Sequence, residues 1–231
     1  MPLRPAERGR AGALLRACLL ALTLGAPLAA AAGDDISAAE HAVFLDEHLR
    51  GLDDRHRLRY DFVLRENAVA VVEDTVTLDV RHDADRGRVV NAEFLHGENQ
   101  LSLPEVDHAE ANPVVLYFLE RDVREMRRRL GGMENYFRKR IRLALADDAG
   151  IEPVTFEYRG RRIQGSRVAV DPYRGDPNQH RFRGMDSKRY EFTLSEQVPG
   201  GIYRLRTSVE PPAGAEGPRI EEVLTLSDSE P

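Results

Sequence analysis

The sequence contains one cysteine and no tryptophan, and these two shortages limit the chemistry that the protein can perform. Its one cysteine, Cys18, lies in an N-terminal segment that we expect to be removed from the mature protein. A chain without cysteine forms no disulfide bond and offers no thiol nucleophile, so its stability must come from a hydrophobic core. Without tryptophan, stacking on a carbohydrate ring would fall to tyrosines such as Tyr136, Tyr173 and Tyr190.

The sequence also lacks the short motifs that mark common catalytic sites. It contains no G-x-S-x-G nucleophile elbow, no helix with paired zinc-binding histidines and no phosphate-binding glycine loop. Residues 107–110 (Asp-His-Ala-Glu) include metal-ligand types, but a zinc site needs three or four ligands at set spacings. We therefore predict no catalytic residue, no metal and no cofactor. A hydrolase of unknown class stays as the enzymatic alternative.

Residues 1–32 have the pattern of an export signal. Arginines such as Arg4 and Arg10 precede an apolar stretch (17–28) that is followed by small residues. This stretch is too short and too rich in alanine to span a membrane as a helix. The segment has no adjacent arginines, and Cys18 stands at the start of the apolar stretch, not at its end. We therefore expect Sec export to a bacterial periplasm or beyond, without a lipid anchor and without a transmembrane span in the mature chain.

The charged residues are unevenly distributed along the chain. The full sequence carries a net charge of −6, whereas residues 112–146 contain nine basic and four acidic residues. An acidic protein is not expected to bind nucleic acid, because phosphate backbones attract basic surfaces. One positive segment in a negative protein instead indicates either a smaller anionic partner or ion pairs with the acidic remainder.

This basic segment, residues 112–146, has the pattern of two helices separated by a Gly-Gly pair. Asn112 is a good N-cap, and Pro113 suits the first helical position. Apolar residues then recur at three- and four-residue steps, first up to the glycines and then from Met133 onward. We expect the first helix to be buried in its first half and exposed in its second. A short buried strand over 114–119 is the alternative, because these residues are apolar all round.

An N-terminal helix is expected at residues 37–52, where Ser37 and Glu40 form a capping box. Most of the remaining chain alternates apolar and polar residues with a period of two, which predicts β-strands. The predicted strands are 58–64, 75–80, 90–94, 154–158, 163–170, 190–194, 203–209 and 220–226. The sequence Val-Pro-Gly-Gly at 198–201 predicts a type II turn between two of them.

Eight strands around a two-helix insertion, without β-α-β alternation, predict an α+β protein that is mainly antiparallel β. Two shapes fit: a curved, half-barrel-like sheet with the helices in its mouth, or a sandwich in which residues 151–226 form an immunoglobulin-like unit. The strand count and export signal also fit the fold of periplasmic lipoprotein carriers, an unclosed barrel covered by helices, as an analogy of fold alone. We divide the chain into a signal peptide (1–32), an N-terminal helix and β-meander (33–111), a basic helical hairpin (112–150) and a β region (151–226) in the same domain as 33–150.

The charge pattern predicts an exported, non-catalytic binding or accessory protein. Several arginines of the basic helices have a glutamate four residues earlier, which is typical of a solvated helix, but others have none. We expect these unpaired cations, with aromatic and arginine residues of the long loop 171–187, to bind an anionic or amphipathic, lipid-like ligand. The predicted binding residues are Arg127, Arg128, Lys139, Arg140, Arg142, Tyr173 and Arg181. Candidate partners are a lipid, an anionic glycan or an acidic protein, and with the last of these the chain would be an adaptor.

Overall fold

The computed structural model of the chain describes residues 36–147, 149–211, 217 and 219–231. The predicted signal peptide lies outside these residues. None of the helices among them has both the length and the apolar character that crossing a membrane requires.

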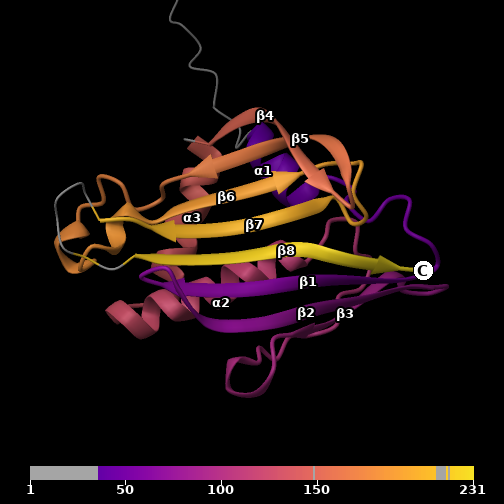
Figure 1. Ribbon diagram of the computed structural model, residues 1–231, viewed down its shortest axis with the longest axis horizontal. Helices are drawn as coiled ribbons and strands as arrows, with labels where there is room; N and C mark the ends of the chain where they lie inside the picture. Colours follow the sequence, from indigo (N-terminus) through magenta and orange to yellow (C-terminus); the bar gives the residue numbers. More distant parts are fainter. Residues whose placement is uncertain (1–35, 148, 212–216, 218) are drawn as a thin grey trace, which may run out of the picture. The chain divides into compact units, whose positions relative to one another are not determined.

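The described residues form one antiparallel sheet of eight strands in the order β3-β2-β1-β8-β7-β6-β5-β4 (Figure 1). The strands are β1 (Arg55–Glu66), β2 (Val69–Asp83), β3 (Gly87–Phe94), β4 (Gly150–Tyr158), β5 (Arg161–Val170), β6 (Arg189–Leu194), β7 (Ile202–Val209) and β8 (Ile220–Glu230). All eight predicted strands are therefore present, and the α+β prediction with a curved sheet is confirmed. The sandwich alternative is wrong, because β8 pairs with both β1 and β7 and so joins the two halves of the chain in a single sheet.

The two faces of the sheet differ in polarity, as the period-two alternation predicts. On β1, Tyr60 and Phe62 are fully buried, whereas Arg57 and Asp61 on the opposite face are exposed. Side chains at every second position of a strand point to the same face, so the apolar set of each strand faces one common core. The inner face of the sheet is thus apolar and the outer face is charged.

Two helices, α2 (Val114–Leu130) and α3 (Glu134–Asp147), cover the inner face (Figure 1). The first half of α2 is buried and its last two turns carry exposed arginines, so the strand alternative for 114–119 is wrong and the predicted burial gradient is confirmed. The predicted start of this helix is one residue early, because Pro113 and not Asn112 is the N-cap. The Asn112 Oδ1 still accepts a hydrogen bond from the Val114 N–H at 3.1 Å.

Two helical predictions need correction. The N-terminal helix is short: α1 (Ala38–Glu40) continues as one wide turn through Leu45 and ends at Asp46, whose backbone is extended, so it does not reach residue 52. Its predicted capping box is present, with Ser37 and Glu40 bonded reciprocally. The second correction concerns Met133, which we placed on the buried stripe of the second helix. It precedes α3 in the turn after Gly132 and is 73% exposed.

The turn between β6 and β7 matches its prediction. The Gly201 N–H donates to the Val198 carbonyl at 3.1 Å, and Gly200 has a φ of 72°, as the third residue of a type II turn requires. A Cβ atom at Gly200 would lie 2.5 Å from Leu58, so this glycine also lets the turn pack against the start of β1.

Candidate functional site

A group of charged side chains is buried between α2 and the inner face of the sheet. The central strand β8 points Glu222 into this layer, where it stands in one cross-strand row with Leu64 of β1, Thr207 of β7 and Tyr190 of β6. Glu222 is completely buried. Such a row would ordinarily be apolar, so a carboxylate at its centre needs a compensating partner.

The helix α2 adds a second buried carboxylate, Asp122, to this layer. This fully buried carboxylate forms an ion pair with the ammonium of Lys188 and accepts a hydrogen bond from the Tyr190 hydroxyl. The Tyr190 hydroxyl lies 3.2 Å from that of Tyr173, which extends the network toward the loop before β6. Burial raises the pKa of Asp122, the Lys188 ammonium opposes this rise, and the negative charge of Glu222 adds to it.

The neighbouring residue, Arg121, supplies the partner of Glu222. Its Nη1 lies 2.7 Å from Oε2 of Glu222, and its guanidinium group stands 4.5 Å from the centre of the Phe62 ring. The contact is an ion pair without good hydrogen-bond alignment. Among the described residues, the Arg121 Nη1 has no well-aligned hydrogen-bond acceptor, and the two carboxylate oxygens of Glu222 have no hydrogen-bond donor. We call Arg121, Asp122, Lys188 and Glu222 the buried charge cluster.

Three members of the buried charge cluster are closed to solvent in this structure. Lys188 is 1% exposed and Asp122 and Glu222 are 0% exposed, so no solute reaches them while α2 lies on the sheet. A buried ion pair adds little stability compared with apolar side chains of the same size, because desolvation offsets the Coulomb attraction. The cluster therefore makes the contact between α2 and the sheet weaker than an apolar contact of equal area.

Three of the five arginines among the predicted binding residues, Arg127, Arg128 and Arg140, have acidic partners, contrary to our expectation of unpaired cations. Arg127 lies 2.8 Å from Glu134, and Arg128 lies 2.6 Å from Glu125. Neither pair has the four-residue spacing on which the prediction depended, because one spans the turn between the helices and the other has three-residue spacing. Both arginine side chains are nevertheless more than 60% exposed.

Arg140 and Tyr173 hold the loop between β5 and β6 against α3. Arg140 binds the Asp176 carboxylate at 2.9 Å and the Pro172 carbonyl at 3.1 Å through its Nε. Tyr173 is completely buried and packs edge-on against Phe137. The loop therefore turns this predicted binding residue into the core, and its role in binding stays a prediction.

The remaining predicted cations, Lys139, Arg142 and Arg181, are exposed. Within the described part of the chain, none of them has an ion-pair partner within 4 Å. Lys139 and Arg142 are three residues apart and share the outer side of α3. Their role as binding residues stays a prediction.

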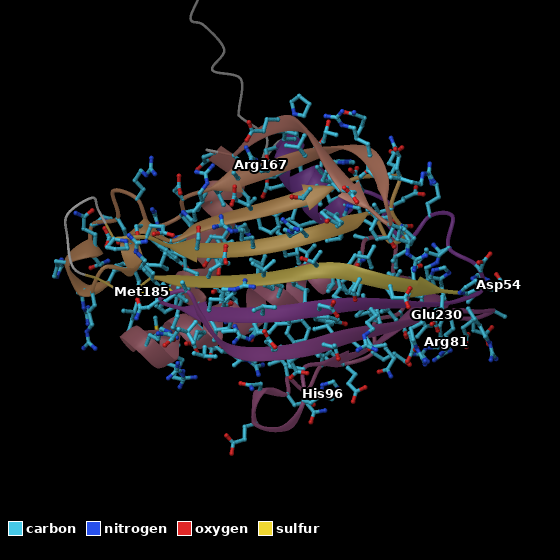
Figure 2. All side chains as sticks on the ribbon, viewed as in Figure 1. Asp54, Arg81, His96, Arg167, Met185 and Glu230 are labelled. Carbon is cyan, nitrogen blue, oxygen red and sulfur yellow. The ribbon has the colours of Figure 1, made fainter. Side chains whose placement is uncertain are left out.

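A hydrolase would need histidine and carboxylate side chains close together, but the loop histidines His108 and His180 lie far apart. His108 is exposed beside Gly87 at the turn between β2 and β3, whereas His180 is exposed in the loop between β5 and β6. These two connections are at opposite ends of the antiparallel strands, as the positions of Arg81 and Met185 illustrate (Figure 2). They do not form the cluster of histidine and carboxylate that a hydrolase would need. Within the described residues, no group of three His, Cys, Asp or Glu side chains has metal-binding geometry.

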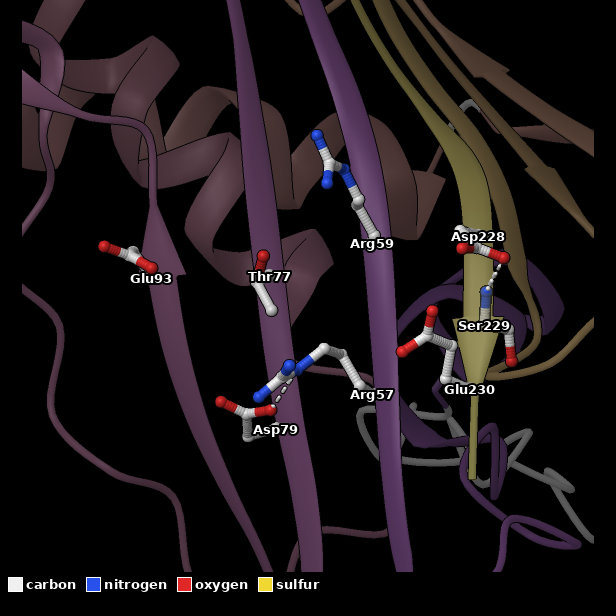
Figure 3. A pocket seen from close by; sticks show the side chains of 8 residues that line it. All are labelled: Arg57, Arg59, Thr77, Asp79, Glu93, Asp228, Ser229 and Glu230. Carbon is white, nitrogen blue, oxygen red and sulfur yellow. Dashed lines mark hydrogen bonds and ion pairs between the residues drawn. The ribbon is translucent and has the colours of Figure 1, made fainter.

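Two pockets lie outside the buried layer. One, of about 310 Å³, is on the outer face of β1, β2 and β8, where Arg57 pairs with Asp79 and the polar side chains of Arg59 and Asp228 complete a shallow wall (Figure 3). The other, of about 220 Å³, is an apolar groove between Phe44, the residues before α2 and the first turn of α2. Neither pocket reaches the buried charge cluster.

Comparisons with known proteins show only distant similarity. No protein-family model matches the chain, and no curated protein does. Among solved structures, the chain is similar to the lipoprotein LppX of Mycobacterium tuberculosis, with 10% identity over 84% of this chain and 94% of that one and a TM-score of 0.35. A DUF1329 family protein from Desulfovibrio piger matches with 11% identity over 83% and 90% of the two chains and a TM-score of 0.26. A LolA superfamily protein from Nitrosomonas europaea matches with 10% identity over 83% and 92% and a TM-score of 0.23. These similarities are too distant to assign a function.

Proposed function

We propose that the protein is a non-catalytic binding protein for an anionic, amphipathic ligand, which enters between α2 and the inner face of the sheet. The observation that supports this most directly is the buried charge cluster. It places two cations, Arg121 and Lys188, within an otherwise apolar layer whose walls suit a hydrocarbon chain.

In this structure, with α2 packed on the sheet, the carboxylates of Asp122 and Glu222 occupy the positions that a ligand head group would take. Glu222 neutralises Arg121 and Asp122 neutralises Lys188. When α2 moves away, an anionic head group competes with these carboxylates for the same cations, while its tail replaces the apolar side chains of the helix. The poorly aligned contact of Arg121 with Glu222 is the weaker of the two and is the first to be exchanged.

Two experiments test the proposal. A titration measures the binding of a fluorescent fatty acid, and native mass spectrometry detects any amphiphile that stays bound to protein purified without lipid removal. We expect Arg121→Gln to weaken binding about 10- to 150-fold, since a hydrogen-bonded ion pair contributes on the order of 1.5–3 kcal/mol. Glu222→Gln should strengthen binding, because it frees Arg121 from its competitor. Glu125→Gln is the matched control, because it removes the partner of Arg128 and one of the two partners of Arg129 at the end of α2, and it should leave binding unchanged.

The proposal fails if wild type binds no amphiphile by either method. It also fails if Arg121→Gln and Glu222→Gln move the affinity in the same direction, since an ion-pair exchange requires opposite effects.

The outer side of α3 favours a second candidate, an adaptor for an acidic protein. Lys139 and Arg142 are exposed there and, among the described residues, have no ion pair. An adaptor would lose a specific acidic partner in a pull-down with Lys139→Glu and Arg142→Glu, while fatty-acid binding would be unchanged. If the pull-down recovers no partner that these substitutions remove, the adaptor hypothesis is rejected.

A further inference from the structure

Three large apolar side chains are exposed at turns near one end of the molecule. Val69 and Val71 start β2 and are 63% and 50% exposed, and Met133 in the turn between α2 and α3 is 73% exposed. Isolated apolar residues on a surface need no explanation, but apolar residues that share one end of a protein do.

Contacts hold these two turns together. The last turn of α2 reaches the hairpin between β1 and β2 through an ion pair of Arg129 with Glu66, which is the cross-strand partner of Val69. The backbone N–H of Asn67 in the same hairpin donates to the carbonyl of Arg219 at 2.8 Å, just before β8. The hairpin, the end of α2 and the start of β8 therefore form one surface.

This surface is rich in arginines that all have acidic partners. We define the arginine-rich end as residues 65–71, 124–134 and 219, which contain six arginines and three glutamates. Three of the arginines also pair with glutamates just outside this set: Arg65 with Glu221, Arg124 with Glu120 and Arg219 with Glu210. At the end of α2 the positive groups stand outermost and make the exposed layer basic. The exposed fractions of Arg127 and Arg128 are 62% and 68%, while those of their partners Glu134 and Glu125 are 24% and 13%.

The two turns are built to project from the fold. Asn67 and Ala68 both have positive φ, 49° and 68°, as a type I′ hairpin requires, and this tight turn holds the valines close to the tip of β2. Gly131 and Gly132 also have positive φ, and a Cβ at either position would meet no atom within 4 Å. The glycines thus present Met133 at an uncrowded turn, away from the core.

We infer that the arginine-rich end docks on the surface of a bilayer that contains anionic lipids. The guanidinium groups of Arg127, Arg128 and Arg219 would lie among the head groups, and Val69, Val71 and Met133 would enter the boundary with the acyl chains. Exposed apolar residues ringed by cations bind such a surface through apolar burial plus electrostatic attraction. Three side chains bury little area, so the attachment is reversible and weakens with salt. It is independent of ligand binding beneath α2.

Co-sedimentation with vesicles tests the inference. The mature protein is mixed with vesicles of phosphatidylcholine alone, or of phosphatidylcholine with phosphatidylglycerol, and should sediment only with the second kind. The variant with Arg127→Gln and Arg128→Gln should lose about fivefold in partition coefficient per arginine. The variant with Val69→Ser and Met133→Ser should lose binding to a similar extent without any change in salt dependence.

Two control variants carry the same kinds of change elsewhere. Arg162→Gln removes an exposed arginine at the turn between β4 and β5, which lies at the opposite end of the strands. Leu116→Ser removes a 56% exposed leucine at the other end of α2. Both should sediment like wild type. Equal sedimentation with neutral and anionic vesicles, no sedimentation at all, or equal losses in the controls would each overturn the inference.

Discussion

The Asp122–Lys188 pair allows a quantitative test of the helix–sheet contact. Lys188→Met removes the cation but keeps a side chain of similar length, which leaves the Asp122 carboxylate buried with only the Tyr190 hydroxyl as a partner. Breaking one side of a buried pair costs about 3–5 kcal/mol. For a domain of this size each kcal/mol corresponds to about 2–4 °C in Tm, so we expect a fall of about 10 °C.

The double variant Asp122→Leu with Lys188→Met gives the comparison. It replaces both charges with apolar side chains, and such replacements range from neutral to about 1–4 kcal/mol more stable. The Tyr190 hydroxyl loses its acceptor, which costs about 1–3 kcal/mol unless it bonds fully to Tyr173 instead. Urea unfolding at pH 7 measures all three proteins. If Lys188→Met costs less than about 1 kcal/mol, or if the double variant is the least stable of the three, the reasoning on desolvation is refuted.

Three further predictions concern protonation and backbone strain. Burial lowers the pKa of His48, whose Nδ1 accepts a hydrogen bond from the Asn112 N–H and whose Nε2 bonds the Ala42 carbonyl. The stability that this neutral ring contributes is present above the unfolded pKa of 6.5 and should be lost as the pH falls below 6.5. Urea unfolding from pH 7.5 to 5 should show this loss in wild type and not in His48→Gln, and an equal slope in both would contradict it. Burial raises the pKa of Glu125, but the hydrogen bonds from Arg128 and the charge of Arg129 outweigh burial and lower this pKa to about 2. An NMR titration that places the pKa of the Glu125 carboxyl near 4.5 would disprove this. Gly200→Ala should destabilise by about 1–3 kcal/mol more than Gly175→Ala, because both have positive φ but only the first would collide with Leu58, and equal losses on thermal unfolding would argue against the collision.

Much of the fold follows from local patterns in the sequence. The strands alternate because one face is packed and the other is charged, and this alternation locates all eight. The order of the strands does not follow, because β1 pairs with β8 across more than 150 residues and no local signal specifies that partner. The N-terminal helix was overestimated because its apolar spacing continues past Asp46, where the backbone leaves the helix while Leu49 is still buried.

The candidate site was missed although the sequence contains a signal for it. Glu222 occupies an inward position of β8, in step with Ile220 and Leu224, where the alternation calls for an apolar residue. Asp122 similarly interrupts the apolar stripe of α2 between Leu119 and Met126. A carboxylate at a core position of a regular pattern indicates a buried partner. The sequence does not indicate that Lys188 and Glu222 lie beside neighbouring residues of α2, because the two come from segments that are far apart along the chain.

The ion pairs on the outer face of the sheet contrast with the buried charge cluster. There Arg206 bridges Glu221 and Glu191, and Arg167 continues the series to Glu152, so charges alternate across six neighbouring strands. Exposed pairs of this kind contribute about 0–1 kcal/mol each, and their loss leaves no buried charge behind. The buried charge cluster differs because its members lie in the layer where apolar side chains would hold α2 more firmly.

This difference predicts a trade between stability and binding. Replacing the whole buried charge cluster (Arg121→Met, Asp122→Leu, Lys188→Met and Glu222→Leu) should leave the protein as stable as wild type or more so, because four desolvated charges are removed as two neutral pairs. The same variant should bind no anionic amphiphile, since both cations are gone and α2 adheres more tightly. A fatty-acid titration and a urea unfolding curve on one preparation test both statements. A variant that is stable and still binds would show that the cluster is a feature of packing alone and that the ligand enters elsewhere.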